Sequence, residues 1–439
     1  MLKKSMYNVE ICDVENNGKL MFNTYSTAFG VMDKETQNIY NSIENLNEDK
    51  IENIKTQDLI NILKSNGFIV NKDLKEYEQV NFKQKVQRYN NKNFNLTIAP
   101  TMNCNMECPY CYEEKINSMM TNDTMLLLMN FVRKFILENG VKNFSVEWYG
   151  GEPLLALNVI KKLSKEFISI CKENSVEYSA SIVSNGILLD YDVANTLKND
   201  CNITSAQITI DGMKELHNKR RILKNNGDSF VIITDNIESI KDILNIIIRV
   251  NVDKNNLIDM PKLIDYIIDE KQWGNKVRLY FYPVVNQTNA CKADANMCIN
   301  QNEFGEIYKK LLQLIHNKRN NDFISKLYPR RECTFCTAIT SNSLVIDPNG
   351  YFYTCWNLIG LKDERIGDSE NGVVLDEKYL KWMTLDIPAS CNECVYLPLC
   401  GGGCPLLRLQ NNNKPVCDYK KVILSQLLKL TYEEAKVLK

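Results

Sequence analysis

The 439-residue sequence has no long apolar run and almost no net charge, −1 at pH 7. A membrane-spanning helix needs roughly 20 mostly apolar residues. The best apolar stretch, residues 243–252, is shorter, contains Arg249 and fits a buried strand better. Lys3 and Lys4 are not followed by an apolar stretch, so no secretory signal is visible. The near-neutral net charge also lacks the excess of positive charge that binds the phosphate backbone of a nucleic acid. We therefore expect a cytoplasmic protein that binds neither membranes nor nucleic acid.

Cysteine, in contrast, is abundant, with sixteen residues. Because disulfides are rare in a reducing compartment, metal ligation or catalysis is the better interpretation. The spacing is uneven, with three cysteines in residues 104–111 and most of the others in residues 333–417. These two segments are therefore the candidates for chemistry.

At a typical length of about 150 residues per domain, the chain is expected to have two or three domains. Changes in the pattern of apolar residues and cysteines along the sequence place them at 1–90, 91–300 and 301–439. The first domain has strands, short helices and a returning strand, an order that resembles a winged helix, with Asp33 as one N-cap. The polar segment 75–93 is expected to be a linker or an exposed helix. The expected elements before it are strands at 7–12, 19–25 and 68–70 and helices at 33–43 and 56–66.

Between residues 95 and 285, expected strands alternate with amphipathic helices, which predicts an α/β fold with a parallel sheet. Six strands are fewer than the eight of a closed TIM barrel, so we expect a partial (β/α)6 barrel. After residue 300 the segment 333–417 is expected to be held by metal rather than by a large apolar core. The strands are expected at 95–100, 144–149, 177–183, 205–210, 245–252 and 277–284, and the clearest helices at 122–138, 158–173, 303–317 and 420–438.

Three cysteines follow the first barrel strand in the spacing Cys104-x3-Cys108-x2-Cys111. Loops at the carboxyl end of such a sheet carry the chemistry of the fold, and thiolates are the usual ligands of iron–sulfur clusters. Three cysteines can hold three irons of a 4Fe–4S cluster and leave one iron open. A zinc site usually draws four ligands from paired short spacings, so a partial zinc or structural site is the weaker alternative.

With Tyr110 before the third cysteine, this triplet resembles the signature of the radical S-adenosylmethionine (SAM) family. The resemblance implies that the open iron binds SAM and that reductive cleavage gives a 5′-deoxyadenosyl radical. It covers about residues 95–285, and four later elements match family motifs in order. The SAM-binding residues that it implies are Gly150, Gly151, Glu152, Ser181, Ser184, Asn185, Asp211, Arg221 and Val250.

Each of these elements also has a plainer interpretation. Gly150 and Gly151 remove side chains, so that a ligand can approach the backbone, but they also suit a tight turn. An arginine grips a carboxylate with two donors, and the resemblance assigns this role to Arg221, whereas Arg220 is expected to contribute little. The alternative is a solvated surface pair. His217 is expected to be structural.

The C-terminal cysteines resemble the SPASM domain of radical SAM enzymes that modify peptides and proteins, which holds two auxiliary 4Fe–4S clusters. A zinc-ribbon module is the alternative. The spacing Cys333-x2-Cys336 departs from the sulfatase-maturing members, so the first ligand set stays open. Cys291 and Cys298 match no motif. The resemblance implies Cys333, Cys336, Cys355 and Cys404 for auxiliary cluster I and Cys391, Cys394, Cys400 and Cys417 for auxiliary cluster II, three clusters in all.

Three features then favour a maturase of a ribosomally made peptide, such as the thioether-forming sactipeptide and ranthipeptide synthases. Sulfatase-maturing members carry Asp where this chain has Trp356 and Gln where it has Tyr149. The third feature is the first domain, which resembles a leader-peptide recognition element that binds a leader as an added strand. We expect a precursor peptide with a leader and an electron donor such as flavodoxin or ferredoxin as partners.

The reaction favoured here is thioether formation between a cysteine sulfur and a substrate carbon, because auxiliary clusters can bind a thiolate and accept an electron. Carbon–carbon crosslinking, epimerisation and sulfatase-type formylglycine formation stay open. A non-enzymatic iron–sulfur electron carrier is the remaining alternative. Such a carrier would need neither Glu152 nor Arg221.

Overall fold

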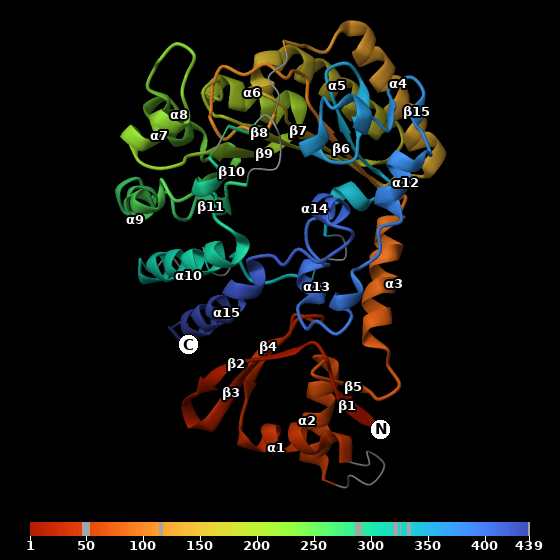
Figure 1. Ribbon diagram of the computed structural model, residues 1–439, viewed down its shortest axis with the longest axis vertical. Helices are drawn as coiled ribbons and strands as arrows, with labels where there is room; N and C mark the ends of the chain where they lie inside the picture. The colour runs from red at the N-terminus through yellow and green to blue at the C-terminus, as the bar shows by residue number, and fades with distance from the viewer. Residues whose placement is uncertain are drawn as a thin grey trace.

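The computed structural model describes residues 1–45, 53–113, 117–285, 291–292, 294–318, 324, 326–331 and 335–437. Along its long axis, a broad unit of strands and helices lies at one end and a smaller unit containing the N-terminus at the other (Figure 1). Helix α3 (Glu76–Arg88) runs between the two, and elements of the C-terminal third lie in the middle. Of the two alternatives expected for 75–93, a linker or a helix, the helix is the one observed.

Six parallel strands in sequential order form the broad unit, which confirms the predicted partial barrel. They are β6 (Asn93–Ile98), β7 (Asn143–Trp148), β8 (Glu177–Ser184), β9 (Ile203–Thr209), β10 (Asn245–Val252) and β11 (Val277–Pro283). The helices that follow the strands are α4 (Asn122–Asn139), α5 (Leu157–Glu173), α6 (Tyr191–Cys201), α7 (Lys214–Arg220), α8 (Ser229–Ile240) and α9 (Met260–Asp265).

The two faces of these strands differ in polarity. In β10, Ile248 and Val250 are fully buried in the main apolar core, whereas Arg249 and Asn251, which alternate with them along the strand, are only half-buried. Successive side chains of a strand point to opposite faces, so one face meets the apolar core and the other lines the inside of the barrel. A closed eight-stranded barrel packs its interior with branched apolar side chains. This open barrel keeps polar residues there.

The sheet continues beyond the six expected strands. Strand β12 (Ser343–Ile346) pairs in parallel with β6, and β13 (Tyr351–Tyr353), β14 (Gly367–Asp368) and β15 (Gly372–Val373) add antiparallel partners, giving ten strands. Leu344 and Ile346 are buried in the same core as the barrel strands. The expectation that 333–417 lacks a large apolar core is therefore wrong for these strands, which are too short to show a periodic pattern.

The N-terminal unit has a small core of its own that includes Leu2, Ile60 and Leu63. Asp33 caps its first helix as predicted, accepting a hydrogen bond from the Thr36 backbone at 2.8 Å. Its sheets are β2 (Asn8–Val14), β3 (Gly18–Asn23) and β4 (Phe29–Met32), and β1 (Leu2–Lys4) with β5 (Ile69–Asn71); its helices are α1 (Lys34–Ser42) and α2 (Ile54–Ser65).

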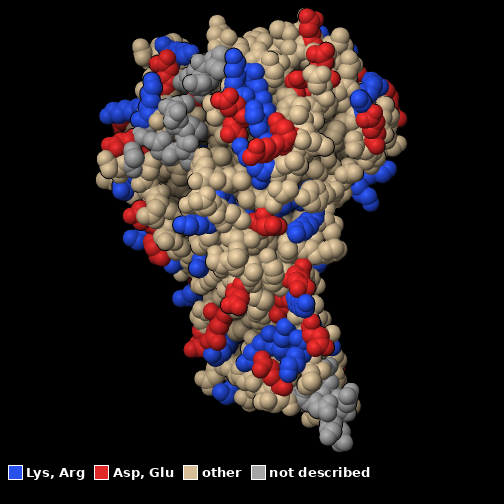
Figure 2. Space-filling model, turned by 45° about the vertical axis from the view of Figure 1, so that its right-hand side comes forward, with Lys and Arg blue, Asp and Glu red and all other residues tan. Residues whose placement is uncertain are grey.

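The remaining helices are α10 (Gln301–Asn317), α12 (Glu377–Met383), α13 (Leu397–Cys400), α14 (Pro405–Gln410) and α15 (Lys420–Val437). Helix α3 is anchored to this region by Arg88, which donates to the carbonyls of Met383 and Leu385, both at 2.9 Å. None of the helices in the described part of the chain is long and apolar enough to span a bilayer. Acidic and basic side chains are interspersed over the face seen in Figure 2.

Candidate active site

The triplet cysteines lie on a loop, residues 104–111, at the carboxyl end of the barrel strands, and line a cavity of about 170 Å³. Backbone hydrogen bonds from Glu107 to Ile222 (2.8 Å) and from Lys224 to Asn105 (3.1 Å) fasten this cysteine loop to the segment after α7. Of the residues that the SAM resemblance implies, the cavity wall contains Gly150, Gly151, Ser184, Asn185 and Arg221.

The two glycines make room for the chain itself. A Cβ atom on Gly151 would lie 2.3 Å from the carbonyl oxygen of Asn103, and one on Gly150, at φ +108°, would lie 2.5 Å from that of Thr101. The backbone that begins the cysteine loop therefore occupies the space of both missing side chains. Of the two interpretations left open for these glycines, a tight backbone contact between two loops is therefore present, and it needs residues without side chains.

Glu152 is fully buried and joins two loops of the site. Its carboxylate accepts hydrogen bonds from the Asn185 backbone (2.7 Å), the Ser184 hydroxyl (2.9 Å) and the Leu154 backbone (3.1 Å). Burial raises the pKa of this carboxyl, and the hydrogen bonds oppose that rise. Glu152 therefore positions Asn185, which faces the cavity, instead of lining the cavity itself.

The expected alternative of a solvated arginine pair is wrong, because Arg220 and Arg221 are each only 7% exposed. The Arg220 guanidinium is paired, with Nη1 2.6 Å from Asp253 and Nε 3.7 Å from Asp211. Arg221 lines the cavity and donates from Nη1 to the Tyr110 hydroxyl at 3.0 Å. Its buried Nε has no hydrogen-bond partner among the described residues. A carboxylate in the cavity would supply that partner, so the residues present fit a bound SAM.

Tyr110 connects Arg221 to the fourth strand, a role that the sequence alone did not reveal. Its hydroxyl donates to Asp211, whose other oxygen accepts from the Asn251 backbone at 2.9 Å. Asp211 is fully buried and is not part of the cavity wall. His217 accepts a 3.3 Å bond from the Asp211 backbone, and burial together with Arg221 and Arg220 lowers its pKa. A buried, neutral His217 agrees with the structural role expected for it.

Val250 lies on the wrong face of its strand for the SAM-binding role that the resemblance implies. Its side chain is fully buried in the apolar core, and β10 presents Arg249 and Asn251 to the cavity instead. Neighbouring residues of a strand point to opposite faces of the sheet, so choosing Val250 in place of its neighbour selected the face away from the cavity. Ser181 is half-buried on β8 but is not part of the wall. The signal that was missed is the alternation of polar with apolar residues along the strand.

The four cysteines of the second auxiliary group, Cys391, Cys394, Cys400 and Cys417, come together. Burial raises the pKa of the Cys400 thiol to about 11, and the charges of Cys394 and Cys391 add to that rise. Cys417 acts on Cys391 in the same way. Gly403 permits this approach: at φ +88° its Cβ would lie 1.7 Å from the carbonyl oxygen of Val416, next to Cys417.

The first auxiliary group consists of Cys336, Cys355 and Cys404, and its fourth expected member, Cys333, lies outside the described residues. Burial raises the pKa of Cys336 to about 11 and also that of Cys355, and the three thiols interact with one another. Among the described residues, no three His, Cys, Asp or Glu side chains are arranged as around a single metal ion. A buried thiolate is costly unless a cation compensates it.

The comparisons with known proteins agree with this site. The sequence model of the Radical SAM superfamily matches residues 98–267, from the end of β6 to just beyond α9. The chain carries a radical SAM domain. Enzymes of this superfamily require a 4Fe–4S cluster and SAM.

Three relatives extend beyond the domain. A cysteine-type anaerobic sulfatase-maturating enzyme of Clostridium novyi is 25% identical over 376 residues, covering 78% of this chain and 97% of the relative. The radical SAM cyclopropyl synthase TigE of Paramaledivibacter caminithermalis is 23% identical over 459 residues, covering 95% and 90%. Streptococcus suis SuiB, solved with precursor peptide SuiA, has a TM-score of 0.54 at 15% identity, covering 96% of this chain and 99% of SuiB. The radical SAM enzyme described here is thus related to peptide-modifying maturases.

Proposed function

We propose that this radical SAM enzyme modifies a ribosomally made precursor peptide, and that it forms a thioether bond between a cysteine sulfur and a substrate carbon. The observation that supports a peptide substrate is the share of this chain that each similar protein covers. The similarity to TigE and SuiB extends over 95% and 96% of this chain, but that to the sulfatase-maturating enzyme stops at 78%. The part left over is about as long as residues 1–90.

The N-terminal unit is suited to hold a leader peptide. Strand β4 lies at the edge of the three-stranded sheet, with β3 as its one strand partner in the described part of the chain. An exposed sheet edge can take an extended peptide as a further strand, and Val31 on β4 is 45% exposed. The unit also contacts the second auxiliary group, because the Thr24 hydroxyl donates to the carbonyl of Val395 at 2.5 Å.

At the radical site, the bound cluster and SAM would supply the radical that removes a hydrogen atom from the peptide. Cys104, Cys108 and Cys111 would ligate that cluster, Arg221 would hold the SAM carboxylate, and Asn185 would be oriented by Glu152. The two auxiliary groups would ligate a further cluster each, with Cys333 completing the first. When the substrate cysteine loses its thiol proton and its sulfur bonds to the carbon radical left by hydrogen removal, an auxiliary cluster would accept the remaining electron. An electron donor such as flavodoxin or ferredoxin would reduce the enzyme.

A second candidate is modification of a sulfatase-like protein, favoured by the relative from Clostridium novyi. The wall beside the cavity argues against it. Tyr149 lines the cavity, and Trp356, directly after Cys355, stacks on it with ring centroids 5.6 Å apart and planes at 13°. The position that carries a proposed carboxylate base in sulfatase-maturing enzymes is therefore an aromatic surface.

Val31→Lys tests the leader-binding role in the intact chain, because a charged side chain on an edge strand discourages pairing. Val374→Lys, at a 50% exposed valine outside the N-terminal unit, is the matched control. With a cysteine-rich peptide encoded beside the gene as substrate, we expect Val31→Lys to keep SAM cleavage but slow peptide modification about tenfold, which corresponds to about 1.4 kcal/mol of binding.

Deletion of residues 1–90 is the stronger form of this test, and it should spare SAM cleavage but abolish coupling to modification. Mass spectrometry of the peptide and 5′-deoxyadenosine yield are the two measurements. If the control, Val31→Lys and a folded truncated enzyme all modify the full precursor at the wild-type rate, leader binding by this unit is wrong and a protein substrate is favoured.

A further inference from the structure

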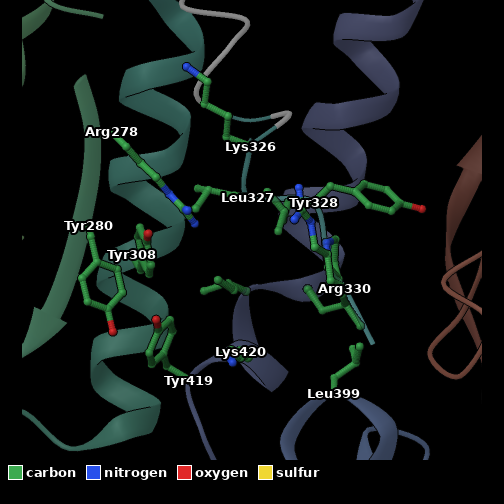
Figure 3. A pocket seen from close by; sticks show the side chains of 14 residues that line it. Arg278, Tyr280, Tyr308, Lys326, Leu327, Tyr328, Arg330, Leu399, Tyr419 and Lys420 are labelled. Atoms are coloured by element: carbon green, nitrogen blue, oxygen red, sulfur yellow. The ribbon is translucent and has the colours of Figure 1, made fainter. Parts of the chain in front are cut away.

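A second cavity, of about 440 Å³, lies away from the cysteine loop. Strand β11 and helix α10 form one side, helix α15 another, and the segment 326–330 closes it (Figure 3). None of the family motifs in the sequence falls on its wall. The residues that line it therefore need an explanation of their own.

The wall carries four basic side chains, Arg278, Lys326, Arg330 and Lys420, and no acidic residue among those described. Arg278 reaches in from β11 and Arg330 from the segment on the other side (Figure 3). Neither guanidinium forms an ion pair with a described residue. Burial and, to a smaller extent, Asp418 raise the pKa of Tyr280 and Tyr419, and the Asp418 carboxylate accepts a 3.0 Å bond from the Lys420 backbone. The cavity is thus locally cationic in a chain of almost zero net charge.

The rest of the wall is aromatic and apolar. The rings of Tyr308 and Tyr419 lie 5.6 Å apart, and burial raises the pKa of Tyr419 well above its usual range, so its hydroxyl stays a neutral donor. Leu399 and Leu424 face the same space. Guanidinium groups pair with carboxylates, whereas the tyrosines and leucines suit apolar side chains. A peptide segment that carries both kinds of side chain matches this lining.

The cavity lies between the N-terminal unit and the radical site. On one side, the Tyr328 hydroxyl donates to the carbonyl of Thr27 at 2.7 Å and its ring packs edge-on against Phe22. On the other side, the Arg249 guanidinium lies 5.8 Å from the ring of Tyr280, which lines this cavity. Arg249 itself lines the cavity of the cysteine loop. Arg249 and Tyr280, which are paired neighbours on β10 and β11, therefore line one cavity each.

We propose that this cavity binds an acidic and apolar segment of the peptide substrate, located between the leader held by the N-terminal unit and the residue modified at the cysteine loop. This proposal rests on the proposed peptide-maturase function and names the chemistry of the segment that the enzyme recognises. Binding there raises the effective concentration of the reacting residue.

The test measures binding and turnover separately. The probe is a fluorescein-labelled synthetic peptide of alternating glutamate and phenylalanine, with its glutamine counterpart as a control, and anisotropy is recorded on the intact enzyme under anaerobic conditions. Arg278 and Arg330 are both exposed, so solvent screens the charge that each offers to a bound carboxylate. We therefore expect Arg278→Gln and Arg330→Gln each to weaken binding of the glutamate probe about two- to fivefold. Arg133→Gln, an arginine paired with Glu166 and Glu173 on the barrel surface, should have no effect.

The same variants are then assayed with a precursor peptide. Their KM for the precursor should rise with SAM cleavage unchanged, and replacing the acidic residues of the precursor should remove the difference from wild type. Equal binding of the two probes, equal binding by all three variants, or stronger competition by a single-stranded oligonucleotide would each overturn the proposal. A precursor that not even the wild-type enzyme modifies would instead contradict the maturase function, while the probe would still report on the cavity.

Discussion

The cysteine loop and the second auxiliary group offer the same type of candidate ligand, the cysteine thiol, in different surroundings. The loop contributes three cysteines to the wall of a cavity, whereas the second auxiliary group brings four together. Three thiolates leave room at a cluster for a substrate, and four do not, as with open catalytic and closed structural zinc sites. The two regions are therefore expected to differ in reactivity and not only in position.

A buried arginine lies beside each of the two cysteine groups, and the two arginines differ in how many hydrogen bonds they form with the protein. Arg221 beside the cysteine loop has an Nε atom without a partner in the described structure. Arg408, 1% exposed, acts electrostatically on Cys391 and Cys404, and its Nε and Nη2 both donate to Asn413, at 3.0 and 2.8 Å. The first guanidinium is free to bind a ligand. The second is fully engaged by the protein, and its charge opposes the rise that burial causes in the pKa of Cys391.

The largest effect should come from breaking the open site. Cys108→Ala removes one of the three proposed cluster ligands, so we expect 5′-deoxyadenosine formation to fall to background while any iron bound by the proposed auxiliary groups remains. Cys400→Ala should instead lower the auxiliary iron content of the enzyme while 5′-deoxyadenosine formation continues. Iron content, spectroscopy and product yield measure both. Near-normal 5′-deoxyadenosine from Cys108→Ala would refute the assignment of the cysteine loop.

The next effect separates the two neighbouring arginines. Breaking a buried ion pair on one side costs about 3–5 kcal/mol. Arg221→Ala should therefore weaken SAM binding by a factor of about 100 or more in anaerobic titration calorimetry, with little change in folding stability.

Arg220→Ala should instead lower the free energy of unfolding by a similar amount, because Asp253 and Asp211 lose their buried cation. Its effect on SAM affinity should stay small, as expected from the sequence, whereas the effect on stability could not be foreseen without seeing that the pair is buried. An equal loss of SAM affinity in both variants, at equal stability, would contradict the distinction drawn between them.

A smaller effect is expected from a change in the second auxiliary group. Gly403→Ala should disrupt the second auxiliary group, because its Cβ would collide with the Val416 carbonyl and the backbone has positive φ. Gly372→Ala has a similar φ, +77°, but its nearest neighbour would be 3.8 Å away. We expect Gly403→Ala to lower the unfolding free energy by about 1–3 kcal/mol more than Gly372→Ala and to reduce iron content. Equal thermal stability and iron in the two variants would argue against the contact.

The sequence predicted the barrel well because its signals are periodic and local. The strands at 177–183 and 245–252 were placed within a residue of their observed bounds, since alternation is read directly from neighbouring residues. Strand β12 has four residues, all buried, and pairs with a strand about 250 positions earlier in the chain. Nothing local distinguishes such a segment from a loop.

The site was predicted less evenly. Residues within motifs, such as Arg221 and Asn185, could be assigned by order, but residues that depend on orientation could not. Val250 was chosen where Arg249 and Asn251 face the cavity, because the sequence does not say which face of a strand points inward. Tyr110 stands inside the triplet, yet its contact with Asp211 joins loops a hundred residues apart.

That contact gives the smallest predicted effect. Tyr110→Phe keeps the ring but removes the hydroxyl that accepts from Arg221 and donates to Asp211. Leaving buried polar groups unpaired costs about 1–3 kcal/mol, but a bound carboxylate would still hold Arg221, so we expect the lower end, about a five- to tenfold loss of SAM affinity. Tyr191→Phe, at a tyrosine that is 57% exposed on α6, is the control. Because Arg221 is free at Nε and restrained at Nη1, an unchanged affinity in Tyr110→Phe would mean that SAM, and not the tyrosine, orients the guanidinium.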